Sequence, residues 1–265
     1  MKSPDMFKKS ILVVSHPDDE ILWFSSIFDK VEEVVFCFLD AKYNPEWTIG
    51  RKQSLSEHPL KNISCLGIDE SEVFSTANWL DPAITTFGLR ISDIRISDRV
   101  YKQNYYKLKK DLKNKLKGFC NVFSHNPWGE YGNEEHVQIY RVIKELQEHM
   151  KFNLWFSNYC GNKSFKLMLK YISGFNSEYV TLKTNITMSN NIKRLYKKNG
   201  CWTWYDDWKW FSEESFMKDG NIVKSSKKYG HIFPVNMIKE ELPSNRFHKA
   251  IRALSGIRVK KKTFF

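Results

Sequence analysis

Residues 10–20, with the sequence SILVVSHPDDE, indicate both the class of the fold and the place of a site. The first half is a short run of mostly β-branched apolar residues, which is typical of a buried strand. Pro17 disfavours helix at His16, and the acidic residues after it suit a helix N-terminus. We therefore predict a strand, a tight polar turn and a helix that continues through residues 21–28.

Strands and helices alternate along the chain to about residue 160. Further strands are predicted at 34–39, 120–123 and 154–156, and helices at 51–66, 105–117, 134–150 and 186–198. Such alternation predicts an α/β fold, a mostly parallel sheet with helices on both faces. Ligands then bind beyond the carboxyl ends of the strands, where the polar clusters 16–20 and 124–136 fall. No linker or repeat divides the chain, so we predict one domain over 1–240.

Charge is distributed unevenly along the 265 residues. Residues 1–160 hold 21 basic and 22 acidic side chains, whereas residues 161–265 hold 21 and 8, and the net charge is +12. The chemistry predicted for residues 1–160 therefore does not depend on a positively charged surface around the site. We expect residues 241–265 to form a basic C-terminal extension. It either contacts an anionic membrane surface or is a solvated tail.

Several classes of protein are excluded by composition. No apolar run approaches the roughly 18–20 residues of a membrane span, and the charged N-terminus has no signal-peptide core. Five cysteines without a C-x-x-C pair argue against a disulfide framework and against a Cys-rich zinc site. No basic, aromatic-interleaved motif indicates nucleic-acid binding. We expect a cytoplasmic protein, either free or peripherally bound at a membrane. The oligomeric state is left open.

Four side chains in the two polar clusters have the types that a catalytic metal site uses. Zinc in such sites takes three imidazole or carboxylate ligands and keeps one position open. His16 and Asp19, three residues apart across a turn, can face one ion, and His136 at the start of a later helix can complete the set. Asp18 then remains to take a proton from water as it attacks a carbonyl. This predicts a metal hydrolase, whereas the alternative is a turn with a helix cap.

The segments SHPDDE (15–20) and SHNPWGEYGNEEH (124–136) resemble the two motifs of the PIG-L / LmbE-like metal-dependent N-deacetylases. The resemblance extends more loosely over residues 10–160 and does not cover the C-terminal third. It implies a Rossmann-like α/β fold and one Zn²⁺ ion. It also implies hydrolysis of an acetamido group, most often that of an N-acetylglucosamine unit that is glycan-, lipid- or nucleotide-linked.

Residue by residue, the resemblance makes His16, Asp19 and His136 the zinc ligands and Asp18 the general base. Tyr131 matches a tyrosine that polarises the acetyl carbonyl in some members.

Two positions depart from the pattern. Asn133 stands where many members have a histidine that stabilises the oxyanion. An amide donates only a neutral hydrogen bond, so we expect Tyr131 to carry more of this work. Arg51 resembles an arginine that holds sugar hydroxyls or phosphate, but Ser54 replaces the acidic residue often found three positions later.

Three further residues of the second cluster are candidates for substrate contact, each with an alternative. His125 could instead hydrogen-bond a ligand carboxylate. Trp128 could stack on a sugar ring or pack in the core. Glu130 could face the substrate or form a salt bridge. The aromatic stretch 202–210 is interpreted either as core and rim packing or as a wall of a glycan- or lipid-facing groove.

The predicted function is thus zinc-dependent deacetylation of an N-acetylated amino sugar. Two alternatives come from other classes. A nucleotide-sugar transferase would use Asp18 and Asp19 to hold a diphosphate-bound cation, although such a hard cation prefers oxygen ligands. A catalytically silent carbohydrate-binding module is the other, with Asn133 as its support.

Overall fold

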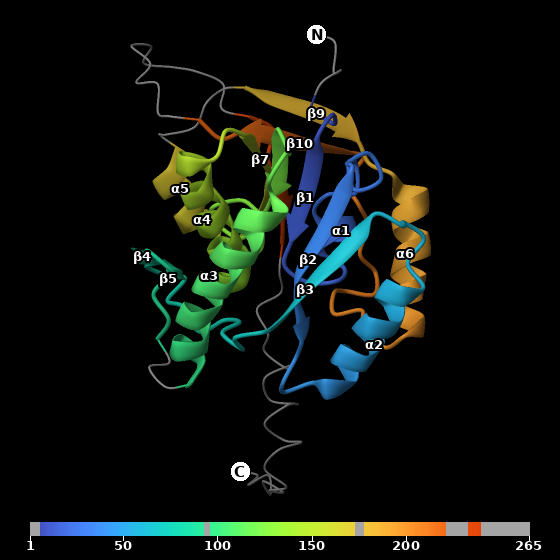
Figure 1. Ribbon diagram of the computed structural model, residues 1–265, viewed down its shortest axis with the longest axis horizontal. Coiled ribbons are helices and arrows are strands. Elements are labelled where there is room, and N and C mark those ends of the chain that lie inside the picture. The colour runs from blue at the N-terminus through green and yellow to red at the C-terminus, as the bar shows by residue number, and fades with distance from the viewer. Residues whose placement is uncertain (1–5, 93–95, 173–177, 221–232, 240–265) are drawn as a thin grey trace, which may run out of the picture.

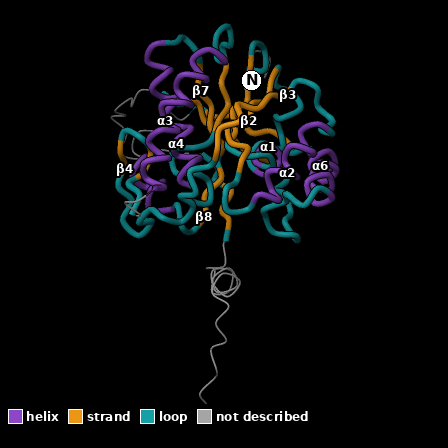
Figure 2. The backbone as a smooth tube through the Cα atoms, turned by 60° about the horizontal axis from the view of Figure 1, so that its bottom comes forward, coloured by secondary structure: helices purple, strands orange, loops and turns teal. Residues whose placement is uncertain are grey.

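A seven-stranded sheet lies between two layers of helices in the computed structural model, which describes residues 6–92, 96–172, 178–220 and 233–239 (Figure 1). The strand order is β3-β2-β1-β6-β7-β10-β9. The first five strands of this order are parallel to one another, and β10 runs antiparallel to both β7 and β9. The tube view shows α3 and α4 on one side of the strands and α1, α2 and α6 on the other (Figure 2). The predicted α/β class, with helices on both faces, is confirmed.

The elements have the following bounds. The parallel strands are β1 (Ser10–Val14), β2 (Glu33–Asp40), β3 (Ile63–Asp69), β6 (Asn121–Ser124) and β7 (Asn153–Ser157), and the other edge holds β9 (Tyr179–Lys183) and β10 (Glu213–Lys218). The helices are α1 (Asp19–Leu22), α2 (Pro45–Ser56), α3 (Ile96–Lys115), α4 (Glu134–His149), α5 (Phe165–Ile172) and α6 (Ile186–Lys198). Two short pairs complete the fold, β4 (Ile84–Thr85) with β5 (Gly88–Leu89) and β8 (Tyr159–Gly161) with β11 (Asn236–Ile238).

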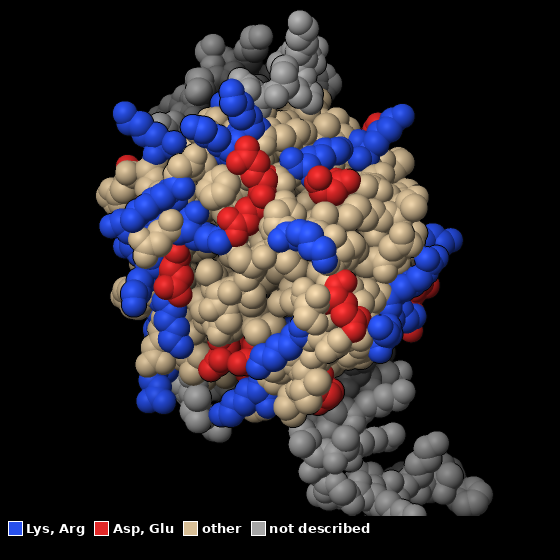
Figure 3. Space-filling model, turned by 45° about the vertical axis from the view of Figure 1, so that its right-hand side comes forward, with Lys and Arg blue, Asp and Glu red and all other residues tan. Residues whose placement is uncertain are grey.

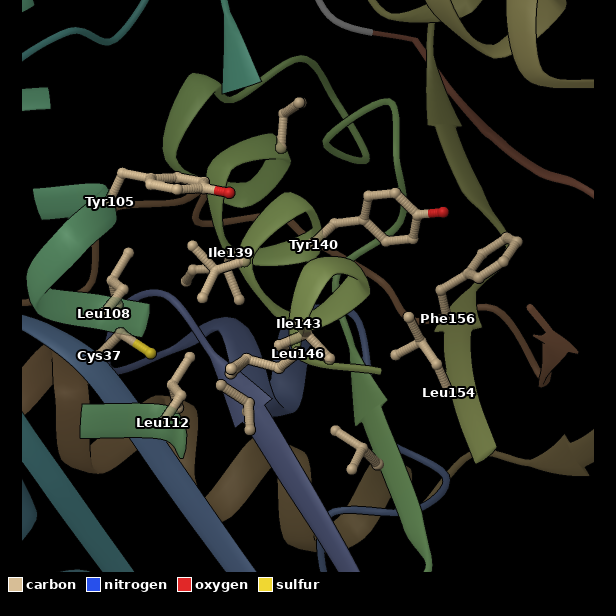
Figure 4. Packing of buried hydrophobic residues seen from close by; sticks show 14 of the residues in the cluster. Cys37, Tyr105, Leu108, Leu112, Ile139, Tyr140, Ile143, Leu146, Leu154 and Phe156 are labelled. Atoms are coloured by element: carbon tan, nitrogen blue, oxygen red, sulfur yellow. The ribbon is translucent and has the colours of Figure 1, made fainter. Parts of the chain in front are cut away.

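The core consists of two apolar clusters, one on each face of the sheet. Successive side chains of a strand point to opposite faces, so β1 contributes to both. Ile11 and Val13 pack in the cluster with α3 and α4, whereas Leu12 and Val14 pack in the other, and all four are fully buried. Figure 4 shows the first cluster, where both helices present apolar residues at helical spacing, namely Leu108, Leu112, Ile139, Ile143 and Leu146. Each such side chain stabilises the fold by about 1.5–3 kcal/mol when fully buried.

The register of the sheet brings the two polar clusters together. β1 and β6 are parallel neighbours, and Val13 pairs with Ser124. Because both strands end at the same edge, the loops that follow them, 15–20 and 124–136, leave the sheet side by side.

The helix predicted through residues 21–28 is wrong beyond Leu22, where α1 ends. The residues after it form turns, and their apolar side chains Trp23, Phe24, Ile27 and Phe28 are fully buried. The apolar run therefore fills the core without helical geometry.

The helix predicted over residues 51–66 is displaced along the chain. It begins at Pro45, a residue well suited to the first helical turn, and ends at Ser56 before Pro59. Residues 63–69 instead form β3, so Arg51 lies in the middle of α2 and not at its head. The helix predicted over 186–198 matches α6, whereas α5, β9 and β10 were not anticipated.

The predicted extension 241–265 lies outside the described residues, and the domain limit at 240 stays a prediction. None of the helices in the described part of the chain has the length and apolar composition that a membrane span requires. On the face shown in Figure 3, basic side chains are interspersed with acidic ones and are not gathered into one patch.

Candidate metal centre

His16, Asp19 and His136 converge at the carboxyl ends of β1 and β6. Asp19 Oδ2 lies 3.4 Å from His16 Nδ1 and 3.3 Å from His136 Nε2. All three residues are buried, with His136 at 0% exposure. One ligand atom from each lies within 4.8 Å of the others, so the group could hold a metal ion.

Two other groups of side chains also meet this distance criterion, and their hydrogen bonds distinguish them. In the group His125, Glu130 and His136, both Nδ1 atoms lie against Glu130 Oε2, at 3.1 and 2.8 Å. His125 Nε2 accepts a hydrogen bond from the Ser15 N–H at 2.9 Å. Both Nδ1 atoms and His125 Nε2 are therefore engaged in hydrogen bonds within the protein, which leaves His136 Nε2, an atom shared with the first group.

The third group, His16 with Glu70 and Glu135, is likewise engaged. Glu70 pairs with the Arg51 guanidinium, and Glu135 Oε2 lies 3.0 Å from His16 Nε2. The set His16, Asp19 and His136 remains as the candidate.

His136 Nε2 provides an independent test of whether a metal fits. This buried atom has no hydrogen-bond partner within the described structure, although its ring is fully enclosed. An unpaired buried polar atom is costly and needs an explanation. Because Nδ1 of the same ring lies against Glu130, Nε2 is the nitrogen that remains to bind a cation, and it faces Asp19 Oδ2 at 3.3 Å. A cation bound by both residues accounts for that arrangement.

Each candidate histidine ligand is oriented by a carboxylate on its other nitrogen. His16 Nε2 donates to Glu135, and His136 Nδ1 donates to Glu130. Glu135 is itself held, because its Oε1 accepts bonds from the Ser71 N–H and hydroxyl at 2.7 and 2.6 Å. Histidines that bind metals usually donate their second N–H in this way, which fixes the tautomer and the ring direction.

The surrounding carboxylates dominate the ionisation of both histidines. Burial lowers the pKa of His16, but Glu70, Asp19 and Glu135 outweigh it and raise the pKa to about 10. Burial likewise acts against charge on His136, whereas Asp19 and Glu130 raise its pKa to about 9. Burial tends to raise the pKa of Asp19, but His136 and His16 hold it well below its usual range. This cluster is thus an anionic cradle that attracts positive charge.

Asp18 lies beside the candidate ligands with a strained backbone. Its φ of 117° is unusual for a residue with a Cβ. Its N–H donates to Glu20 Oε2 at 3.0 Å, and its Oδ2 accepts the Thr203 hydroxyl at 2.8 Å. Burial and the neighbouring Asp19 raise the pKa of Asp18 to about 7, while the Thr203 bond acts in the opposite direction.

Glu130 and His125 were predicted as substrate contacts, but both are fully buried. Burial tends to raise the pKa of Glu130, but His125 and His136 lower it to about 2, so the carboxylate is charged. Its other oxygen accepts the Asn126 N–H and the Ser157 hydroxyl at 2.9 and 2.8 Å. Glu130 therefore has the salt-bridging role, and His125 supports the site from within the core.

Trp128 likewise differs from its predicted place in a substrate surface. It is at 0% exposure, and its indole N–H donates to Tyr159 O at 2.6 Å. The ring meets Phe156 edge-on with centroids 5.7 Å apart. Its faces lie in the core, which is the alternative that the sequence left open.

Tyr131 and Asn133 lie together at the start of α4. Asn133 is the N-cap of this helix, since its Oδ1 accepts the Glu135 N–H at 2.8 Å. Its Nδ2 donates to the Tyr131 hydroxyl oxygen at 2.9 Å. The Tyr131 ring contacts His136 edge-on at 5.5 Å and Trp204 at 4.7 Å. The amide of Asn133 is thus engaged at both ends, whereas Tyr131 is the half-buried group beside a candidate ligand.

Arg51, predicted to hold sugar hydroxyls or phosphate, is only 3% exposed. Its Nη1 pairs with Glu70 and donates to Leu39 O at 3.2 Å. Its Nε has no hydrogen-bond partner within the described structure. The guanidinium charge is balanced by Glu70 inside the protein.

A cavity of about 600 Å³ adjoins the candidate centre at the ends of β2 and β3. Its inner wall includes Glu70, which lies 3.5 Å from His16, and Ser71, which holds Glu135. Four carboxylate residues line it against a single lysine, namely Asp40, Asp69, Glu70 and Glu72 with Lys42. The rest of the lining combines apolar residues, including Tyr43 and Ile49, with the hydroxyl residues Thr48 and Ser97.

Sequence reasoning missed Glu135, Glu70 and Thr203. Glu135 directly precedes the candidate ligand His136, and a carboxylate next to a candidate histidine is a usable signal. Glu70 follows a strand that was not predicted, and Thr203 lies in a segment with no motif. The sequence therefore contains no signal that indicates either residue.

The fold and this cluster define an α/β protein with a candidate metal centre at its strand ends. No protein-family profile matches the chain. The chain is similar to "Uncharacterized protein L374" of Acanthamoeba polyphaga mimivirus, with 23% identity over 199 residues, which cover 71% of this chain and 80% of that protein. It is also similar to a solved structure described as a deacetylase–teicoplanin complex from the biosynthesis pathway of teicoplanin. There the identity is 12%, the coverage is 79% of this chain and 98% of that chain, and the TM-score is 0.47.

Proposed function

We propose that the protein is a zinc-dependent N-deacetylase that hydrolyses the acetamido group of an N-acetylated amino sugar of the N-acetylglucosamine type. One observation carries the proposal. The buried His136 Nε2 forms no hydrogen bond within the described structure, and it faces Asp19 at 3.3 Å in a cluster that also contains His16. Asp18, a carboxyl with a pKa near neutrality, lies directly beside that cluster.

The donor set favours zinc over a hard cation. Two imidazole nitrogens and one carboxylate oxygen are typical of catalytic zinc, whereas magnesium and calcium prefer oxygen ligands. His16, Asp19 and His136 would hold the ion. When bound, Zn²⁺ acts as a Lewis acid that polarises a carbonyl oxygen and increases the acidity of water. The same donor set argues against the alternative of a diphosphate-binding transferase.

Asp18 is the proposed general base. Its carboxyl can accept a proton near neutral pH because burial and Asp19 raise its pKa to about 7. It would remove a proton from the water that attacks the acetamide carbon, as the new C–O bond forms. It would then return that proton to the amine as the C–N bond breaks, releasing acetate and the free amino sugar.

Tyr131 is the proposed hydrogen-bond donor to the oxyanion. Its hydroxyl oxygen accepts a bond from Asn133 Nδ2, and its ring lies edge-on to the His136 ring with centroids 5.5 Å apart, so the hydroxyl is held beside a candidate ligand. Asn133 was predicted to share this role, but its amide caps α4 and holds Tyr131. We therefore assign Asn133 to positioning Tyr131 and not to direct contact with the oxyanion.

The substrate we propose lacks phosphate close to the acetamido group. Arg51, the residue expected to meet phosphate, is balanced by Glu70, and the adjoining cavity is lined by four carboxylate residues. Like charges near an anionic substrate weaken binding. A glycan-linked amino sugar or a neutral conjugate fits this cavity better than a nucleotide-linked one. We also propose that residues 241–265 contact an anionic membrane surface. The proposed location is therefore cytoplasmic or peripheral at the membrane.

Metal analysis and an acetate assay together test the function. Purified protein should contain one zinc per chain, and it should release acetate from a neutral N-acetylglucosamine glycoside faster than from the corresponding sugar phosphate. Chelation followed by added zinc should abolish and then restore release. Zinc binding without acetate release from any N-acetylated sugar would instead favour the silent binding module.

A further inference from the structure

Thr203 contacts the proposed base although it lies outside both motifs. Its Oγ1 is 2.8 Å from Asp18 Oδ2, and its backbone N–H lies 3.4 Å from the same oxygen. A hydroxyl next to a carboxylate oxygen acts as the donor. A residue 185 positions further along the chain thus holds one oxygen of Asp18.

The segment that carries Thr203 is anchored on both sides of it. Cys201, fully buried, donates its N–H to Tyr196 O of α6 at 3.0 Å. The indole N–H of Trp210 donates to Ile21 O of α1. Because both anchors belong to the layer of helices beside β1, the position of Thr203 relative to Asp18 is set by packed structure.

The backbone of Asp18 is held from the same side of the sheet. Its left-handed conformation is unfavourable and persists only where surrounding contacts enforce it. Glu20 accepts the Asp18 N–H through one oxygen and the Tyr196 hydroxyl at 2.8 Å through the other. The backbone and the carboxylate of Asp18 are therefore both held by contacts that lead to α6 and to the segment after it.

We infer that Thr203 is a positioning residue that holds the Asp18 carboxylate in the orientation needed to accept a proton. The inference rests on the proposed function for the role of Asp18. It extends that function by making the hydrolytic centre depend on residues 201–210, so that the two motifs are insufficient without this segment.

A pair of substitutions at one position tests the inference. Thr203→Val keeps the shape and removes the donor, whereas Thr203→Ser keeps the donor. A hydrogen bond to a charged group contributes enough for its loss to lower kcat by about 10- to 100-fold. We expect this loss in the valine variant, with KM and the zinc content unchanged and with the serine variant close to wild type.

The matched control is Thr184→Val. The Thr184 hydroxyl donates to Phe211 O at 2.7 Å in the same part of the fold, away from the candidate centre. We expect wild-type kcat for this variant. The inference is overturned if Thr203→Val is fully active, if Thr203→Ser is as impaired as Thr203→Val, or if the valine variant loses zinc in proportion to activity.

Crystal structures of metal-free wild type and Thr203→Val separate this inference from the proposed function. If wild-type protein deacetylates no amino sugar, the proposed function fails. The orientation of the Asp18 carboxylate in the two crystal structures still tests whether Thr203 positions it. A carboxylate that turns away in the valine variant supports positioning by Thr203, and an unchanged carboxylate overturns it.

Discussion

The two loops that supply the candidate ligands keep their side chains in place by different means. Loop 124–136 is supported largely from within, because Glu130 holds His125 and His136, and Asn133 caps the helix that begins next to it. Loop 15–20 has internal bonds, from the His16 N–H to Asp19 and from the Asp18 N–H to Glu20, but distant residues hold the side chains of His16 and Asp18. Glu135 holds His16, and Thr203 holds Asp18.

Both loops nevertheless contain one acidic residue in a left-handed conformation. The φ values are 117° for Asp18 and 50° for Glu130. In loop 124–136 the strained carboxylate of Glu130 orients a candidate ligand, whereas in loop 15–20 the strained carboxylate of Asp18 belongs to the proposed base. This difference predicts that substitutions at Glu130 and His136 in loop 124–136 act through metal binding, whereas substitution of Asp18 in loop 15–20 lowers turnover with the metal retained.

The strongest test of this contrast compares Asp18→Asn with His136→Ala. Asp18→Asn should keep one zinc per chain and lower kcat by about 10²–10⁴-fold, since it removes the general base. His136→Ala should lose zinc as well as activity. Metal content and acetate release measure both. If Asp18→Asn instead lost zinc while metal-reconstituted protein kept its activity, the roles of Asp18 and Asp19 would have to be exchanged.

The next largest effect is expected at the start of α4. Tyr131→Phe should lower kcat by about 10²–10³-fold, the usual cost of one oxyanion donor, without changing thermal stability. Asn133→Ala should lower the free energy of unfolding by about 1 kcal/mol through loss of the helix cap and should affect turnover only mildly. Kinetics and urea unfolding of both variants separate the two roles. A fully active Tyr131→Phe protein would contradict the assignment.

Glu130→Gln and Glu135→Gln compare the supports of the two histidines. Each removes the carboxylate that orients one ligand, so zinc affinity should fall by about 10- to 100-fold in both variants. Glu130→Gln should also destabilise the metal-free protein more, because Glu130 accepts four hydrogen bonds inside one loop and its neighbouring strand. Competition with a chromogenic chelator gives the affinities. Unchanged affinity in either variant would place that histidine outside the metal site.

The smallest expected effect is a pH dependence of zinc binding. In the metal-free fold the pKa values of His16 and His136 are raised to about 10 and about 9, so both rings are protonated at pH 7. Because zinc needs neutral imidazole, binding should release protons, and affinity should rise by at least about tenfold per pH unit between pH 7 and 8. Calorimetry in buffers of different ionisation enthalpy counts the protons. A pH-independent affinity would exclude both histidines as ligands.

The same shifts set the sign of a stability effect in metal-free protein. A raised pKa in the folded state means that the protonated histidines stabilise the fold fully below about pH 6.5, their unfolded value. This contribution is lost as the pH rises toward 9–10. Urea midpoints of the chelated protein should fall over that range, and bound zinc should remove the effect.

The sequence predicted the parts of this molecule that local patterns encode. β1 and β6 are short apolar runs that each end in a polar cluster, so the meeting of His16 and His136 followed from parallel strand order. The turn 23–28 was mistaken for helix because its apolar residues, Trp23, Phe24, Ile27 and Phe28, have the spacing of a helix face, although the structure buries them in turns.

The supporting residues could not be predicted from the sequence, and the reason is a different one. Thr203 acts on Asp18 through tertiary packing across 185 positions, and no local pattern distinguishes it from other threonines. Glu134 and Glu135 are adjacent and chemically identical, yet only Glu135 contacts His16, whereas Glu134 bonds with the loop 75–79. Which of the two faces the site depends on the rotation of α4, and that is set by its core contacts.

The left-handed backbone at Asp18 has a consequence for protein engineering. A glycine at residue 18 would relieve strain on the order of 1–3 kcal/mol and would also eliminate the carboxylate of the proposed base. A library screened for heat resistance should therefore enrich glycine at this codon, while one screened for turnover should retain aspartate. Opposite enrichment in the two screens would show that aspartate at residue 18 lowers the stability of the fold and is retained for catalytic activity.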